Sequence, residues 1–87
     1  MTYSVITSRS ADRDIGRLDS RIRRQVFAKM LALKDNPRPQ DVKLLRGQGR
    51  SYRIHSGEYR ILYEIDDEAK VVLVFRVGHR RDVYRNL

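Results

Sequence analysis

The chain has 87 residues, the size of one domain, and its 19 Lys and Arg against 11 Asp and Glu give a formal net charge of +8. This basic balance favours a polyanionic partner, such as RNA, DNA or the ribosome, over the alternative that the charge serves solubility alone. The absence of cysteine excludes a disulfide framework, a thiol nucleophile and a cysteine zinc site, and no apolar run approaches the roughly 20 residues of a membrane span, so we expect a cytoplasmic protein.

The chain begins with a predicted strand and a short helix. Residues 2–7 alternate in polarity and include β-branched side chains, which is typical of strands. Ser8 or Ser10 can then cap a short helix that holds Ile15 and Leu18.

A longer helix is predicted next. Asp19 or Ser20 can cap it, and its periodic pattern continues to about Lys34. Its apolar stripe is expected to comprise Ile22, Val26, Met30 and Leu33, widened by Phe27 and Leu31.

The second half of the chain predicts a sheet. A loop starts at 36–39, where two prolines stop the helix. Three strands follow, at about 50–55, 58–65 and 70–77. The last of them is apolar on both faces, which indicates a central strand, and residues 80–86 are expected to form one or two helical turns.

The hairpin between the first two of these strands carries the most informative pattern. We expect Ser56-Gly57 to form its two-residue turn, which places Arg53 directly opposite Arg60. Like charges directly opposite on a sheet are destabilising, so such a pair indicates a surface that binds an anion. The expected core face comprises Tyr52, Ile54, Tyr59 and Ile61, and the other face comprises Arg53, His55, Glu58 and Arg60.

The next strand pairing completes the expected fold. If Tyr63 pairs with Leu73, Arg76 lies beside Arg60 on the basic face. The predicted fold class is α+β, in the order β-α-α-β-β-β-α, with two helices packed on one face of a mainly antiparallel sheet.

The basic face has the components of a phosphate site. Its arginines are Arg53, Arg60, Arg76 and Arg80. A guanidinium binds phosphate bidentately but keeps its proton, so His55 is the best proton carrier on this face; the alternative is an exposed histidine paired with Glu58. Tyr84 lies among the arginines of the tail, where it can either stack on a base or pack the tail onto the sheet.

These groups suit metal-free RNA cleavage. In that reaction the substrate 2′-hydroxyl attacks the adjacent phosphorus, so the protein supplies a base, an acid and fixed positive charge. DNA lacks this hydroxyl and would not be cut in the same way. Two histidines without cysteine cannot supply a zinc cage, and we expect no cofactor.

Several blocks of residues and their spacing carry a family resemblance. They are Leu45-Arg46-Gly47, Tyr52-Arg53-Ile54, Gly57-Glu58-Tyr59-Arg60-Ile61-Leu62-Tyr63, Val77-Gly78-His79-Arg80 and Asp82-Val83-Tyr84. Over nearly the whole chain they resemble the RelE branch of the RelE/ParE toxin superfamily. The resemblance implies a toxin of a type II toxin–antitoxin pair, which enters the ribosomal A site, cuts mRNA there, and is blocked by a RelB-like antitoxin in a hetero-oligomer.

The resemblance also implies roles for single residues. Arg60 would stabilise the transition state, Arg80 would contact the scissile phosphate or the leaving group, and Tyr84 would orient or stack on an mRNA base. The family often has lysines at the places of Arg53 and His55, so His55 becomes the expected base while Arg53 keeps only the positive charge. The residues expected to hold RNA or the ribosome are Arg46, Lys43, Arg50, Arg76, His79 and Arg81.

Two other functions remain open from the sequence. One is a ParE-like toxin that poisons gyrase and uses the same fold as a binding module. The other is a non-catalytic RNA-binding domain of this fold. Arg60, Arg80 and Tyr84 favour the nuclease, because a gyrase poison does not need that set.

Overall fold

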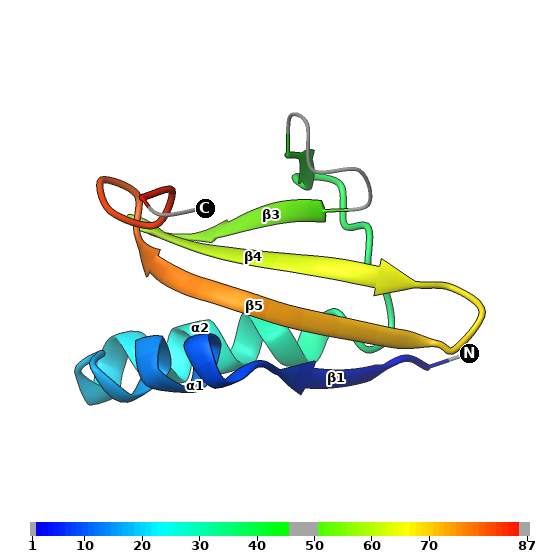
Figure 1. Ribbon diagram of the computed structural model, residues 1–87, viewed down its shortest axis with the longest axis horizontal. Coiled ribbons are helices and arrows are strands. Elements are labelled where there is room, and N and C mark those ends of the chain that lie inside the picture. Colours follow the sequence, from blue (N-terminus) through cyan, green and yellow to red (C-terminus); the bar gives the residue numbers. More distant parts are fainter. Residues whose placement is uncertain (1, 46–50, 86–87) are drawn as a thin grey trace.

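The protein folds as two helices packed on one face of a five-stranded sheet (Figure 1). The computed structural model describes residues 2–45 and 51–85. In chain order, the elements are β1 (Ser4–Thr7), α1 (Arg9–Gly16), α2 (Ser20–Ala32), β2 (Lys43–Leu44), β3 (Ser51–Ser56), β4 (Tyr59–Asp66) and β5 (Val71–His79). The strand order in the sheet is β1-β5-β4-β3-β2, and only the β1–β5 pair is parallel. The predicted fold class and the interior position of the last strand are therefore confirmed.

Both helices begin at side-chain caps that the sequence predicts. The Ser8 hydroxyl accepts a hydrogen bond from the Ala11 N–H at 3.1 Å, and the Asp19 carboxylate accepts from the N–H groups of Arg21 and Ile22 at 3.0 Å each. These caps satisfy backbone donors that have no partner within the helix, and so they fix where each helix starts.

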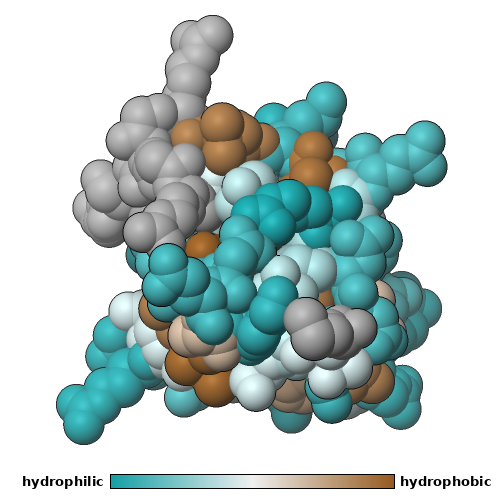
Figure 2. Space-filling view, turned by 90° about the vertical axis from the view of Figure 1, so that its right-hand side faces the viewer, coloured by the Kyte–Doolittle hydropathy of each residue, from teal (hydrophilic) through white to brown (hydrophobic). Residues whose placement is uncertain are grey.

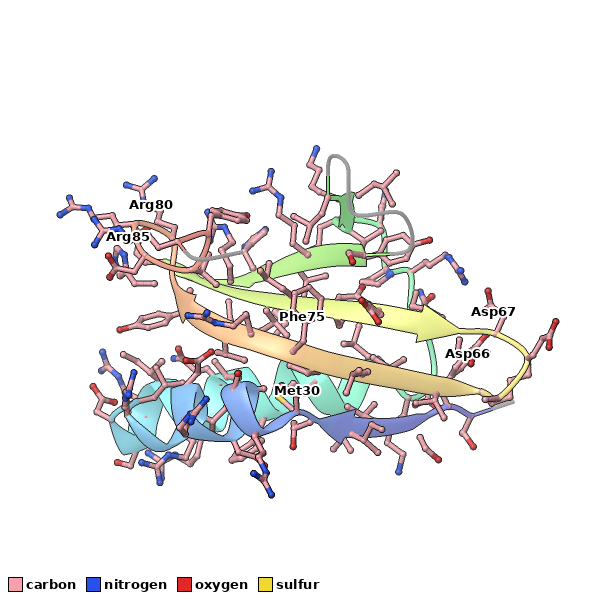
Figure 3. The ribbon with its side chains drawn as sticks, viewed as in Figure 1. Met30, Asp66, Asp67, Phe75, Arg80 and Arg85 are labelled. Atoms are coloured by element: carbon pink, nitrogen blue, oxygen red, sulfur yellow. The ribbon has the colours of Figure 1, made fainter. Side chains whose placement is uncertain are left out.

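The main core lies between the helices and the sheet. Its buried side chains include Ile15, Val26, Met30 and Leu33 from the helical half and Ile54, Ile61, Tyr63, Val72 and Val74 from the strands. Figure 3 shows Met30 in the helix layer, below the strand that carries Phe75. The prediction that Phe27 and Leu31 widen the buried stripe is wrong, because these side chains are 48% and 63% exposed.

A second, smaller apolar cluster lies on the opposite face of the sheet. It contains Leu45, Leu62 and Val83, with Phe75 packed against them. Residues 80–85 form hydrogen-bonded turns rather than a helix, and the bond from the Val83 N–H to the His79 carbonyl closes one such turn. Burial of Val83 therefore anchors the C-terminal tail on the sheet.

The β3–β4 hairpin has the predicted faces but a different register. Ser56 pairs with Tyr59, so the turn is Gly57-Glu58 rather than Ser56-Gly57. Gly57 has a φ of +60°, which favours glycine at the first position of a two-residue turn. This moves every pair by two residues without exchanging the faces.

The two pairings predicted between arginines are consequently wrong. Arg53 lies opposite Leu62, and it is His55 that lies opposite Arg60. Between β4 and β5 the register shifts at Leu62/Tyr63, with Phe75 as the extra residue, and Arg76 lies opposite Leu62 instead of beside Arg60. This irregularity brings both Val74 and Val77 to the helix-side core, which an uninterrupted strand of period two cannot do.

The described residues differ from the sequence prediction in one further element. The two-residue strand β2 pairs with β3 at the edge of the sheet, where the sequence predicts a loop.

Among residues 2–45 and 51–85, no helix is long and apolar enough to cross a membrane.

Candidate active site at the β3–β4 turn

The turn between β3 and β4 contacts two arginines, one from β4 and one from the segment after β5. The Arg60 Nη1 donates to the carbonyl oxygens of Gly57 and Tyr59, each at 3.1 Å. Arg80, which follows β5, places its Nε 2.8 Å from a carboxylate oxygen of Glu58 and donates its backbone N–H to the Glu58 carbonyl at 2.8 Å. Three consecutive residues thus orient both guanidinium groups.

A surface pocket of about 330 Å³ lies beside this turn. It is lined by Asp41, Lys43, Arg53, Ile54, His55 and Arg60. Three of these side chains are cationic and one is a carboxylate, so the pocket has a positive balance that suits an anion. The predicted basic face is therefore present, although its arginines reach the pocket by a different register.

His55 has a carboxylate partner that the sequence does not reveal. Its Nε2 lies 3.6 Å from an oxygen of Asp41, whereas the alternative partner, Glu58, contacts Arg80. Asp41 lies in the loop before β2, and the pairing of Lys43 with Arg53 carries that loop alongside His55. The short strand β2 places Asp41 beside His55, and its two residues are too few to form a sequence pattern that would predict this contact.

Arg53 and Tyr84 join the hairpin to the C-terminal tail. The Arg53 Nη1 donates to the Tyr84 hydroxyl at 2.6 Å, and the guanidinium carbon lies 5.8 Å from the centre of the ring. Tyr84 is 38% exposed while its neighbour Val83 is buried. The sequence allowed Tyr84 either to pack the tail onto the sheet or to stack on a base. Val83 provides the packing, and the ring of Tyr84 stays at the surface.

Arg76 lies outside this cluster. Its Nε lies 3.0 Å from an Asp14 carboxylate oxygen, and the same oxygen accepts the Val77 N–H at 2.9 Å. The Arg76 side chain is only 28% exposed. Its expected place in the row of phosphate-binding arginines is therefore wrong, and its proposed contact with RNA stays a prediction.

The other described residues expected to bind RNA lie on two parts of the sheet: Lys43 pairs with Arg53 at the edge, and His79 and Arg81 lie at the end of β5. Lys43 and Arg81 are exposed, and the His79 ring packs edge-on against Tyr59 with centroids 5.4 Å apart. The His79 Nδ1 accepts the Arg81 N–H at 3.2 Å. Arg46 and Arg50 lie outside the described residues.

Acidic groups gather at the opposite end of the sheet. Figure 3 shows Arg80 and Arg85 at one end and Asp66 and Asp67 at the other, and Figure 2 faces this acidic end, where hydrophilic side chains cover the centre of the view. Hydrogen bonds from Arg38 and from the Tyr3 hydroxyl lower the pKa of Asp67 to about 2. This carboxylate is thus ionised and paired, far along the strands from the β3–β4 turn.

The site offers acid–base and electrostatic chemistry. His55 can accept or donate a proton, while Arg60 and Arg80 can bind an anionic oxygen and Tyr84 presents an aromatic face. Within the part of the chain that the structure describes, no three His, Asp or Glu side chains come together as metal ligands.

Comparisons with known proteins agree with this geometry. A family model described as the ParE toxin of the type II toxin–antitoxin system parDE matches residues 5–84. The chain is 36% identical to toxin RelG of Mycobacterium tuberculosis over 98% of this chain and 99% of that protein. It is 34% identical to the mRNA interferase toxin RelE of Escherichia coli over 92% of this chain and 85% of that protein.

The fold is shared with a toxin of known structure. In the crystal structure of the toxin–antitoxin complex RelBE2 from Mycobacterium tuberculosis, one chain matches with a TM-score of 0.82 and 34% identity, covering 92% of this chain and 100% of that chain. The resemblance expected from the motifs is confirmed: the chain belongs to the RelE/ParE family of type II toxin–antitoxin toxins.

Proposed function

We propose that this protein is a ribosome-dependent endoribonuclease that cleaves mRNA in the ribosomal A site and is held inactive by a cognate RelB-like antitoxin. The observation that carries the proposal is the convergence of Arg60 and Arg80 on one turn, beside a pocket that contains His55. A relative that spans most of the chain is named an mRNA interferase, and a structural neighbour is a toxin–antitoxin complex. Both names support the proposal.

Each residue has a defined part in the proposed reaction. His55 accepts the proton of the substrate 2′-hydroxyl, whose oxygen then attacks the adjacent phosphorus. Arg60 binds the non-bridging oxygens as negative charge develops on them, and Arg80 hydrogen-bonds the phosphate at the departing 5′-oxygen. The bond from phosphorus to the departing 5′-oxygen breaks, this oxygen takes a proton from water, and His55 returns its own proton to the solvent. The products are a 2′,3′-cyclic phosphate and a free 5′-hydroxyl, so the protein contributes no nucleophile.

The remaining groups of the site orient the substrate. Arg53 donates a hydrogen bond to the Tyr84 hydroxyl, and it thereby fixes an exposed ring on which an mRNA base can stack. The Asp41 carboxylate lies 3.6 Å from the His55 Nε2, so its charge attracts the imidazolium that forms when the ring takes the proton.

Cleavage of mRNA on programmed ribosomes tests the proposal. We expect the wild type to cut, Arg60→Ala to cut about 10²–10³-fold more slowly because a positioned cationic donor is lost, and His55→Ala to be slower by about 10²-fold or more. Glu68→Gln, at the opposite end of β4, is the matched surface control. A 2′-deoxy substitution at the scissile nucleotide should stop the reaction, and continued cutting would exclude the proposed attack.

A gyrase-poisoning toxin is the second candidate, because the matching family model is described as a ParE toxin. Gyrase-dependent DNA breaks, measured with the same wild-type protein, distinguish the two functions. Breaks together with intact mRNA would overturn the nuclease proposal. Intact DNA together with Arg60-dependent mRNA cleavage would exclude the poison.

A further inference from the structure

A second surface pocket, of about 270 Å³, lies where α1, the start of β4 and the end of β5 meet. Figure 1 shows α1 continuing along β5 from the point where β1 ends. We call this site the α1–β5 pocket, and it shares no lining residue with the pocket beside the β3–β4 turn. The ionisable side chains that line it are Asp14, Arg17, Tyr59, Arg76, His79 and Asp82.

Arg76 is fixed in this pocket by a largely buried partner. Its Nε donates to an Asp14 carboxylate oxygen at 3.0 Å, and the Arg76 and Asp14 side chains are only 28% and 11% exposed. The same oxygen accepts the Val77 N–H at 2.9 Å, so the carboxylate is itself held by the backbone. No group in the described part of the chain forms a hydrogen bond with the two terminal nitrogens of Arg76. These nitrogens therefore offer parallel donors to a phosphate on a side chain that is already oriented.

Arg17 and His79 add further donors to the same pocket. Arg17 caps the C-terminal end of α1, and its side chain is exposed. The His79 Nδ1 accepts the Arg81 N–H at 3.2 Å, so the neutral ring carries its proton on Nε2. The pocket thus combines two guanidinium groups with an imidazole N–H.

The charges of the pocket leave one cation unbalanced. Asp14 is paired with Arg76. The second aspartate of the lining, Asp82, lies with one oxygen 3.6 Å from the Arg85 Nη1. Among residues 2–45 and 51–85, no carboxylate forms an ion pair with Arg17. The positive charge of Arg17 is therefore available to an anion from outside the protein.

We propose that the α1–β5 pocket binds a phosphate of the RNA backbone, other than the scissile one, through Arg17, Arg76 and His79. The inference rests on the proposed function for the kind of polyanion, RNA, and not for the cleavage step. His79 pairs with Tyr59, the residue before Arg60 on β4, so the pocket adjoins the proposed active site. A phosphate contact positions RNA without reading its sequence. A second phosphate held here fixes the orientation of the protein on the RNA.

Binding of a single-stranded 2′-O-methyl RNA to the free protein tests the pocket without cleavage, because the blocked 2′-oxygen cannot attack. Arg17→Gln should bind about fivefold more weakly at about 150 mM salt. The slope of log affinity against log salt should become shallower by about 0.7, the loss of one phosphate contact.

Arg9→Gln is the matched control, because it removes the same charge from an exposed position at the other end of α1. Arg9 lies about 12 Å from Arg17 along the helix axis, which is beyond the screening length of about 8 Å at this salt concentration. The control should change the affinity by less than about twofold.

Arg76→Lys tests whether the planar guanidinium matters. Lysine keeps the charge but lacks the fork of donors, so we expect the affinity to fall about as much as in Arg17→Gln. Urea denaturation checks that each variant is folded, and if Arg76→Lys is not, Arg17→Gln decides. Three results would overturn the inference: no RNA binding by wild type, equal binding by Arg17→Gln and Arg9→Gln, or wild-type affinity in a folded Arg76→Lys.

Cleavage on programmed ribosomes assigns the source of the phosphate. Arg17→Gln should raise the protein concentration at half-saturation about fivefold and leave the saturated rate within about twofold of wild type. This difference should vanish with an mRNA whose phosphate in the pocket is made neutral as a methylphosphonate, if that phosphate belongs to mRNA. A difference that persists at every substituted position assigns the phosphate to ribosomal RNA.

The two assays separate this inference from the proposed function. Wild-type protein that binds the free RNA in an Arg17-dependent manner but leaves mRNA on the ribosome intact would overturn the proposed function and retain the pocket. Cleavage of mRNA with the same half-saturation for wild type and Arg17→Gln would overturn the pocket and retain the nuclease.

Discussion

Asp14 binds Arg76 at the point where β5 loses its neighbouring strand. β1 pairs with β5 only from Val71 to Val74, and beyond that pairing one Asp14 oxygen accepts both the Arg76 Nε–H and the Val77 N–H. The carboxylate thus satisfies the Val77 N–H, a backbone donor at the sheet edge that has no neighbouring strand to pair with. It also fixes α1 against the part of β5 that leads to His79.

Removing this carboxylate should destabilise the fold. Asp14→Ala leaves a partly buried N–H and a partly buried guanidinium without their acceptor, because the Asp14 and Arg76 side chains are only 11% and 28% exposed. We expect a loss of about 2–3 kcal/mol in the free energy of unfolding, measured by urea denaturation. Asp35→Ala, at an exposed carboxylate, should change it by less than about 0.5 kcal/mol. Equal effects of the two variants would contradict this account.

Alternation of side chains made the two faces of the hairpin predictable, but not its register. Arg53 and His55 share a face in any pairing of β3, and Ile54 lies on the other face, as predicted. The register depends on which residue takes the positive φ of the turn, and Gly57 fits either position of a two-residue turn. The alternating pattern therefore could not reveal the two-residue error in register, and that error changed only the cross-strand partners.

The parts of the site that escaped prediction depend on tertiary contacts. The register shift at Phe75 lets both Val74 and Val77 face the core. This requirement arises only from packing of the helices on the sheet, so the strand sequence alone does not predict it. Asp41 reaches His55 through a loop that has no periodic pattern. Tyr84, in contrast, was predictable as a candidate because an aromatic among arginines stands out in any arrangement.

Tyr63 anchors the loop that brings Asp41 to the site. Its buried hydroxyl donates to the Pro37 carbonyl at 2.7 Å, and burial raises its pKa. Tyr63→Phe leaves that carbonyl without its donor, so we expect a loss of about 1–2 kcal/mol in the free energy of unfolding by urea denaturation. Tyr59→Phe, whose hydroxyl makes no hydrogen bond with the described residues, is the control. An unchanged stability of Tyr63→Phe would show that water replaces the lost partner.

The ring of Tyr84, more than its hydroxyl, should matter for cleavage. Stacking of a base on an aromatic ring contributes about 1–3 kcal/mol, so Tyr84→Ala should lower the cleavage rate by about 10–10²-fold. Tyr84→Phe keeps the ring but loses the acceptor for Arg53, and we expect at most about a fivefold fall, since one surface hydrogen bond is lost. The measurement is the rate on programmed ribosomes with each variant at saturation. A Phe variant as slow as the Ala variant would assign the role to the hydroxyl.

The acidic end of the sheet should make stability depend on pH through Asp67. Its carboxylate accepts hydrogen bonds from Arg38 and Tyr3, which lower its pKa from 3.8 to about 2 in the folded protein. A group whose pKa is lower in the folded state binds protons more tightly when unfolded. Its contribution to stability is therefore complete above about pH 4 and is lost as the pH falls towards 2.

Asp67→Asn should accordingly lower the free energy of unfolding at pH 7 and lose most of this effect near pH 2. The asparagine cannot carry the charge that pairs with Arg38, so above pH 4 only the wild type has the interaction. Urea denaturation of both proteins at pH 7, 5, 3 and 2 measures the difference between them. For Glu68→Gln, in the same turn, the free energy of unfolding should differ little from that of wild type, and this difference should not shrink between pH 4 and pH 2. A gap between wild type and Asp67→Asn that stays constant from pH 7 to pH 2 would contradict a role for the ionised carboxylate, because protonation would then not remove what the substitution removes.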